Sequence, residues 1–218
     1  MAHLVFLHTA EVNVSTFERL TLELAPGTAT THIADAELLD RARTDGLDDL
    51  QLAATLHARL RRFVESGDLL VCTCSTIGGL VESVGSDLGM ATMRIDRPMA
   101  AEAVTRGRRI AVVAAIESTV EPTCALLHEE AARAGHEIEL VVSVCEDAWA
   151  RFEANDHHGY AMAIADHVRA IAPGVDVVVL AQGSMSGAAA LLSDLDIPVL
   201  SSPRLGVAAA LERFSRTA

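Results

Sequence analysis

Short apolar runs alternate along the chain with longer stretches in which apolar residues recur at three- and four-residue spacing. The first pattern is typical of strands buried on both faces, and the second of amphipathic helices. The predicted strands are residues 3–8, 68–72, 90–93, 109–113, 137–142, 175–180 and 198–200, with a shorter one at 30–33. The most regular predicted helices are residues 47–64, 120–134, 160–171 and 186–195. This alternation predicts an α/β fold in which helices cover parallel sheets.

One segment occurs twice. Residues 68–78 return in altered form at residues 176–186, and the two copies align without a gap, 108 residues apart. Each copy is an apolar run that stops in hydroxyl and glycine residues, which is the pattern of a buried strand leading into a helix N-terminus. The alignment sets three pairs opposite each other: Cys74 and Gln182, Ser75 and Gly183, Thr76 and Ser184. We expect the two strand ends to face one ligand, one with a thiol and the other with an amide.

The order of strands and helices is also repeated, and each half closes with a short strand, at residues 91–97 and 198–204. We therefore predict two pseudosymmetric lobes, each a parallel sheet flanked by helices. The first lobe is residues 1–97 plus 204–218, and the second is residues 98–203. Because no Gly-, Pro- or Ser-rich linker separates them, we expect rigid packing and an active-site cleft between the lobes.

Composition narrows the class of protein. The 218 residues are 50% hydrophobic, which is enough for a large core. Seventeen Lys and Arg against thirty Asp and Glu give a net charge of −13, so nucleic acid is not an expected partner. The N-terminal residues lack a signal-peptide pattern and no apolar window approaches a membrane span, so we predict a cytoplasmic protein that does not enter a membrane. In that compartment the four cysteines are expected as thiols.

The sequence lacks the motifs that would indicate a bound metal or a nucleotide cofactor. Cys72 and Cys74 form one closely spaced pair, but Cys124 and Cys145 do not form a second one. No G-x-G-x-x-G fingerprint is present, and no Lys-(Ser/Thr) follows the Gly78-Gly79 pair as a phosphate loop requires. We predict no metal and no cofactor.

The two matched strand ends carry a resemblance. Cys74-Ser75-Thr76 resembles the first Cys-(Asn/Ser)-Thr motif of the aspartate/glutamate racemase superfamily, and residues 180–184, Leu-Ala-Gln-Gly-Ser, stand where its second Cys-Thr motif would be. Residues 94–99 and 201–206 strengthen the likeness, which covers nearly the whole chain. The resemblance implies two α/β lobes with a cleft between them, a small carboxylate or amino-acid substrate, cofactor-independent chemistry and a homodimer.

Gln182 departs from the family pattern. Racemases of the family use one thiolate to remove the α-proton and a second thiol to return a proton, and an amide cannot act as acid and base in turn. Two-thiol racemisation is therefore disfavoured. Cys74 alone still suits a racemase/isomerase-type reaction or a one-thiol decarboxylation, and a non-catalytic carboxylate-binding or regulatory protein is the alternative. The non-functional alternative is that Cys74 is simply a small buried apolar residue.

The remaining candidate residues follow from the resemblance and from their places at strand ends. Cys74 and Gln182 are the expected catalytic pair. Substrate-binding residues are expected after the strands of both halves: His8, Thr9, Ser75, Thr76, Ser118, Thr119, Gly183 and Ser184. The hydroxyl residues among them also suit helix caps.

Other polar residues have two interpretations. Arg94, Arg97 and Arg204 are candidates for holding a carboxylate, with surface solvation as the alternative. Ala115 stands where similar enzymes have a carboxylate-binding threonine, which hints at a substrate other than glutamate. For His157 and His158 we favour a polar helix start capped by Asn155 or Asp156 over a metal site or a general base.

Overall fold

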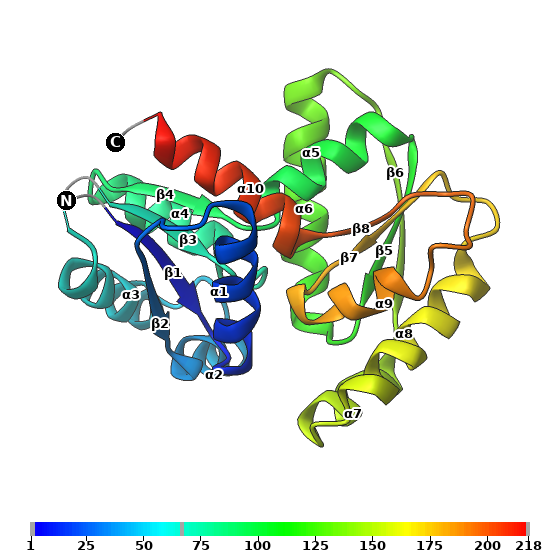
Figure 1. Ribbon diagram of the computed structural model, residues 1–218, viewed down its shortest axis with the longest axis horizontal. Coiled ribbons are helices and arrows are strands. Elements are labelled where there is room, and N and C mark those ends of the chain that lie inside the picture. Colours follow the sequence, from blue (N-terminus) through cyan, green and yellow to red (C-terminus); the bar gives the residue numbers. More distant parts are fainter. Residues whose placement is uncertain (1–2, 66–67, 217–218) are drawn as a thin grey trace. The chain divides into compact units, whose positions relative to one another are not determined.

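The computed structural model describes residues 3–65 and 68–216, and the chain divides into two compact units. The first unit is Met1–Ile95 with Pro203–Ala218, and the second is Asp96–Ser202. Each unit contains a four-stranded parallel sheet flanked by helices (Figure 1). The predicted α/β fold of two similar halves is confirmed.

The sheet of the first unit has the order β2-β1-β3-β4. Its strands are β1 (Leu4–His8), β2 (Thr30–Ala34), β3 (Leu69–Cys72) and β4 (Ala91–Arg94). Its helices are α1 (Val12–Leu24), α2 (Ala36–Asp45), α3 (Leu50–Phe63), α4 (Gly78–Asp87) and, at the C-terminus, α10 (Ser202–Ser215). One face of the sheet packs its apolar side chains against α2, α3 and α4, and the other face against α1 and α10.

The sheet of the second unit has the corresponding order β6-β5-β7-β8. Its strands are β5 (Arg109–Ala114), β6 (Glu139–Val144), β7 (Val177–Leu180) and β8 (Val199–Ser201). The helices are α5 (Arg97–Arg106), α6 (Val120–Ala134), α7 (Glu146–Glu153), α8 (His157–Ile171) and α9 (Ser186–Ala190), with short 3-10 turns η1 (Glu117–Thr119) and η2 (Gly183–Met185). Helices α7, α8 and α9 cover one face, while α5 and α6 contact strands β7 and β5.

The central strands pair in the equivalent register in the two sheets. Leu7 pairs with Cys72 in the first, and Val113 pairs with Leu180 in the second. The hydrogen bond beyond these pairs is also repeated: Thr73 N–H donates to the Leu7 carbonyl and Ala181 N–H to the Val113 carbonyl, both at 2.9 Å. The register therefore makes four pairs of positions equivalent: His8 and Ala114, Thr73 and Ala181, Cys74 and Gln182, Arg94 and Ser201.

A buried aspartate precedes β3, and an exposed one precedes β7 at the equivalent position. Asp68 accepts hydrogen bonds from the backbone N–H groups of His3 at 2.8 Å and Glu65 at 2.9 Å. Asp176 accepts from the N–H groups of Arg108 at 2.8 Å and Arg109 at 2.7 Å. Each carboxylate thus ties the start of the neighbouring central strand to its own strand, and the repeated Asp of the sequence is structural.

Two sequence predictions about helices have different outcomes. Helix α8 begins after Asp156, whose carboxylate accepts from Gly159 N–H at 2.9 Å, so the predicted cap is confirmed. The helix predicted over residues 186–195 is wrong in length, because α9 ends at Ala190. Arg169 instead donates to the Leu191 carbonyl at 2.6 Å and to Asp194 at 2.9 Å, which holds the following residues in a turn.

Within residues 3–65 and 68–216, no helix is long and apolar enough to cross a membrane.

Candidate functional site

The candidate thiol lies at the carboxyl end of β3. Cys74 is half-buried and its side chain packs against the apolar cluster under α2, α3 and α4. Cys72, two residues earlier, is fully buried in the same cluster, and its thiol donates a weak hydrogen bond to the Cys74 carbonyl at 3.5 Å. Cys72 therefore belongs to the core, and Cys74 is the more accessible of the two cysteines.

Two buried hydroxyls follow the thiol. Ser75 and Thr76, 4% and 3% exposed, lie in the turn that leads into α4. Among the described residues, neither hydroxyl oxygen has a hydrogen-bond partner. The N-cap position of α4 is Ile77, so the capping role considered for these hydroxyls is wrong. A buried hydroxyl left unpaired costs roughly 1–3 kcal/mol, which favours a partner supplied from outside the chain.

Arg94 packs against this turn and is hydrogen-bonded to it. Its guanidinium is buried and donates to the Ser75 carbonyl at 3.3 Å, and its backbone N–H donates to Glu82 at 3.1 Å. The side chain lies so close to α4 that a Cβ added at Gly78 would be 3.0 Å from the Arg94 Cβ. The surface interpretation of Arg94 is thus wrong: this cation is part of the interior that holds the Cys74–Thr76 segment.

A buried polar chain lies at the ends of β1 and β3. Thr73 donates to the Leu7 carbonyl at 3.2 Å, so its single hydroxyl proton is committed and its oxygen accepts from His8 Nδ1–H at 2.9 Å. His8 Nε2 must then accept, and His32 Nδ1–H donates to it at 2.9 Å. His8 is fully buried, and both of its ring nitrogens are bonded to protein groups.

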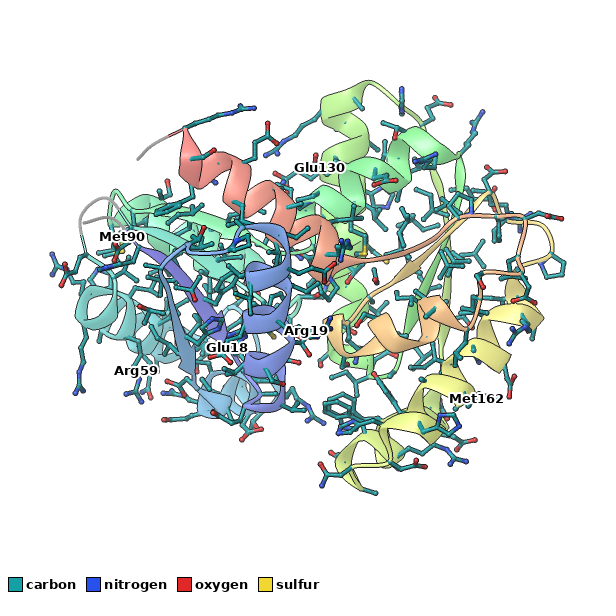
Figure 2. The ribbon with its side chains drawn as sticks, in the orientation of Figure 1. Glu18, Arg19, Arg59, Met90, Glu130 and Met162 are labelled. Carbon is teal, nitrogen blue, oxygen red and sulfur yellow. The ribbon has the colours of Figure 1, made fainter. Side chains whose placement is uncertain are left out.

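This arrangement requires the His8 imidazole to be neutral, because one of its ring nitrogens donates and the other accepts. Burial, with the neighbouring His32, lowers the pKa of His8 to about 4. Burial also lowers the pKa of His32, against the opposing effect of Glu18 on α1, which is labelled in Figure 2. Thr9, predicted beside His8, is also buried.

In the second unit, Gln182 occupies the position equivalent to Cys74. The side chain follows β7 and is 7% exposed. Its Oε1 accepts a hydrogen bond from the backbone N–H of Ala115, after β5, at 2.7 Å. Gln182 Nε2 is buried and has no partner within the described residues. The amide is therefore held at one end and unsatisfied at the other.

Hydroxyl residues surround these strand ends. The buried Ser118 Oγ in η1 is another atom for which the described part of the chain supplies no partner. Thr119 Oγ1 donates to the Ile116 carbonyl at 2.8 Å and makes no capping hydrogen bond to α6. Ser184, beside Gly183 in η2, exchanges a 3.0 Å hydrogen bond with the hydroxyl of Tyr160 on α8. Burial raises the pKa of Tyr160 to about 12, so the phenol is protonated at neutral pH.

Two of the candidate arginines pair with acidic side chains. Arg97 contacts Glu129 at 3.1 Å and Glu130, and Glu130 is labelled on α6 in Figure 2. Arg204 pairs with Glu23 at 2.8 Å on the surface. Over the residues that the structure describes, no group of three or more His, Cys, Asp or Glu side chains is arranged to hold a metal ion.

Within each unit, the structure groups the predicted residues at the carboxyl edge of the sheet. His8 is the last residue of β1 and Thr9 follows it, and β1 is the neighbour of β3, which the Cys74–Thr76 segment follows. In the second unit, Gln182 lies at the end of β7, next to β5, and is bonded to Ala115. Sequence reasoning missed Thr73, His32, Tyr160 and the buried position of Arg94. Tyr160 is the only tyrosine of the chain, but nothing in its local sequence indicates the bond to Ser184.

Comparison with known proteins bears on the fold. No family model and no curated protein matches the chain. Solved structures do match. A glutamate racemase from Bacillus anthracis matches with a TM-score of 0.71 at 14% identity, covering 100% of this chain and 83% of that one. The Picrophilus torridus aspartate racemase gives 0.70 at 14%, covering 99% and 95%, and the allantoin racemase from Pseudomonas fluorescens gives 0.65 at 18%, covering 99% and 91%.

The chain therefore has the same α/β fold as these racemase structures. At equivalent strand ends of its two units, this chain carries unlike groups, the thiol of Cys74 and the amide of Gln182.

Proposed function

We propose that the protein is a cofactor-independent racemase/isomerase-type enzyme that acts on a small carboxylic or amino acid through Cys74. The observation that carries this proposal is the set of buried polar atoms left unpaired at the carboxyl edges of both sheets. Ser75, Thr76, Ser118 and Gln182 each have one such atom within the described residues. A protein fold does not gain from such atoms, whereas a bound carboxylate would accept hydrogen bonds from them.

In this mechanism Cys74 is the group that exchanges a proton with the substrate or adds to it. The segment after Cys74 leads into α4, and the first N–H groups of a helix favour negative charge nearby. The hydroxyls of Ser75 and Thr76 would hold the substrate carboxylate. As the carbon next to the carboxylate loses its proton, charge moves onto the carboxylate oxygens, and the same donors stabilise that charge.

The role of Gln182 would be electrostatic. An amide has no titratable group at neutral pH, so the second proton transfer of a two-thiol racemase is not available from this position. Gly183 and Ser184 would bind substrate beside Gln182, and the protonated phenol of Tyr160 is hydrogen-bonded to the Ser184 hydroxyl. Isomerisation and one-thiol decarboxylation are both compatible with a single thiol.

The test is replacement of Cys74 by Ala and by Ser. Small carboxylic and amino acids are incubated with the protein in deuterated water, with proton exchange followed by NMR and stereochemistry by chiral chromatography. We expect both variants to lose exchange by about 10²–10⁴-fold. Cys124→Ala is the matched control, since Cys124 is also half-buried but lies on α6. Equal exchange by the Cys74 variants and the control would sink the proposal.

Gln182 also supports a second candidate, a non-catalytic carboxylate-binding or regulatory protein. Such a protein would need the unpaired donors but no second thiol. Calorimetry and thermal shift distinguish the two candidates, because a binding protein is stabilised by an organic acid that it leaves unchanged. Conversion of the acid by the unmodified protein, lost in Cys74→Ala, removes this candidate.

A further inference from the structure

The orientation of the Gln182 amide has a chemical consequence. The Ala115 backbone N–H is only a donor, and it lies 2.7 Å from one end of the amide. That end must therefore be the oxygen, because an NH₂ group there would set two donors against each other. The bond to Ala115 thus fixes which end of Gln182 is which.

The other end of the amide is consequently an NH₂ group with both hydrogens available. Gln182 is 7% exposed, and its nitrogen finds no acceptor anywhere in residues 3–65 and 68–216. The hydroxyl oxygen of Ser118 is likewise buried and unpaired in that part of the chain. This strand end therefore offers the donors of Gln182 and Ser118, while the amide oxygen already accepts a hydrogen bond from Ala115.

We propose that Ala115, Ser118 and Gln182 form a pocket for an acceptor oxygen of the substrate, a carboxylate or carbonyl, and that an ammonium group is not bound there. This inference rests on the proposed function and names the substrate class more closely: a small acid that presents an oxygen, rather than its amino group, to the second unit. An ammonium group has three donors and no acceptor, so it would leave the Gln182 hydrogens unsatisfied and add repulsion between donors.

The same geometry defines the role of Gln182 in the reaction. A fixed NH₂ group aimed at an oxygen strengthens its hydrogen bonds when that oxygen gains negative charge, as it does when the neighbouring carbon is deprotonated. The Ala115 bond prevents the amide from rotating, so this donor is oriented before the substrate arrives. Gln182 would therefore polarise the substrate and would not exchange protons with it.

The experiment compares succinate with β-alanine, which replaces one of its carboxylates by an ammonium group at the same chain length. Dissociation constants are measured by calorimetry at pH 8.5 for the unmodified protein, Gln182→Glu and Gln182→Met. Glu keeps an acceptor for Ala115 N–H but replaces the NH₂ group by a second acceptor. Met has a similar length, no donor and only a weakly accepting sulfur. Thermal melting without ligand verifies that each variant is folded.

For the unmodified protein we expect succinate to bind at least about tenfold more tightly than β-alanine. Gln182→Met should weaken succinate binding about tenfold, and Gln182→Glu should weaken it further and reverse the preference. If Gln182→Glu binds succinate as well as the unmodified protein does, or if β-alanine is preferred throughout, the inference is overturned. It is also overturned if neither succinate nor its neutral diamide, succinamide, binds saturably.

Turnover separates this inference from the proposed function. If Cys74→Ala abolishes exchange while the Gln182 variants bind both ligands unchanged, the thiol chemistry stands and the acceptor pocket falls. If the binding pattern holds while Cys74→Ala has no effect on turnover, the thiol chemistry falls instead.

Discussion

The two units have sheets of the same topology but carry different residues at equivalent positions. In the first unit, a hydrogen-bonded chain of His32, His8 and Thr73 crosses the three neighbouring strands β2, β1 and β3 near their carboxyl ends. The counterparts in the second unit are apolar: Val142, Ala114 and Ala181. The order and register of the strands are the same in both. The fold therefore does not need the polar chain, which occurs only in the unit that contains the candidate thiol.

The largest expected effect comes from cutting that chain. His8→Ala leaves a cavity and removes the partner of both Thr73 and His32, so we expect the free energy of unfolding to fall by about 3–4 kcal/mol. Urea denaturation measures it. The control is the triple variant His8→Ala, Thr73→Ala, His32→Val, which copies the second unit. Because it removes all the partners together, it should recover part of the loss. A triple variant less stable than His8→Ala would contradict the comparison.

The next effect is a dependence of stability on pH. The pKa of His8 is about 4 in the folded protein and 6.5 when exposed, so between these values the unfolded state binds more protons. The free energy of unfolding therefore has its full value above pH ~6.5 and falls as the pH drops toward ~4. The total loss is roughly 3 kcal/mol, at about 1.36 kcal/mol per pKa unit. The depressed pKa of His32 acts in the same direction. Denaturation at a series of pH values tests this slope, which the triple variant should lack. The same slope in both proteins would exclude the histidines as its cause.

A smaller effect is expected at the start of α4, where the units also differ. Gly78 lies against Arg94, while the equivalent positions of the second unit are Ser186 and Ser201. Gly78→Ala places a methyl group 3.0 Å from the Arg94 Cβ, which should cost about 1–3 kcal/mol, reduced by the roughly 1 kcal/mol that Ala gains over Gly in a helix. Thermal melting measures the change. Gly79→Ala is the control, because its nearest Arg94 atom would be 3.5 Å away. A larger loss in the control would refute the packing explanation.

The smallest effect is expected at the aspartates that the two units share. Hydrogen bonds from the N–H groups of Arg109 and Arg108 lower the pKa of Asp176, so its contribution is present above the unfolded pKa and is lost as the pH falls through the folded value. Asp176→Asn should reduce stability at pH 7 and by less at low pH. Asp68→Asn should reduce it more, because the Asp68 carboxylate is buried. The comparison by urea denaturation fails if Asp176→Asn is the more damaging variant at pH 7.

Much of the fold could be predicted from the sequence, because strands buried on both faces leave uninterrupted apolar runs. Both copies of the repeat became the inner strands β3 and β7, and the helix over 120–134 was predicted to its ends. The helix over 186–195 was not, since its Ala- and Leu-rich sequence favours a helix that Arg169 ends from another element. The helix propensity of a segment carries no information about a contact made by a residue of another element.

The candidate site could be predicted as a set of positions but not as a set of bonds. Cys74 and Gln182 were recognised because the repeat aligns them. The bond from Ala115 to Gln182 depends on the register of β5 with β7, and that between His8 and His32 on the register with β2, a weakly patterned edge strand. Contacts between residues distant in the sequence decide which polar atoms remain available to a ligand.

The return of the C-terminal helix affects how the chain is made. Val207 and Ala210 of α10 pack in the same cluster as Leu4 and Phe6. On the ribosome, the first unit cannot finish its core until residues beyond 203 have emerged, although its sheet is translated first. Synthesis stopped before α10 would leave part of an apolar face of that sheet uncovered, beside α1, so an incomplete chain would be a substrate for chaperones and proteases rather than a working half.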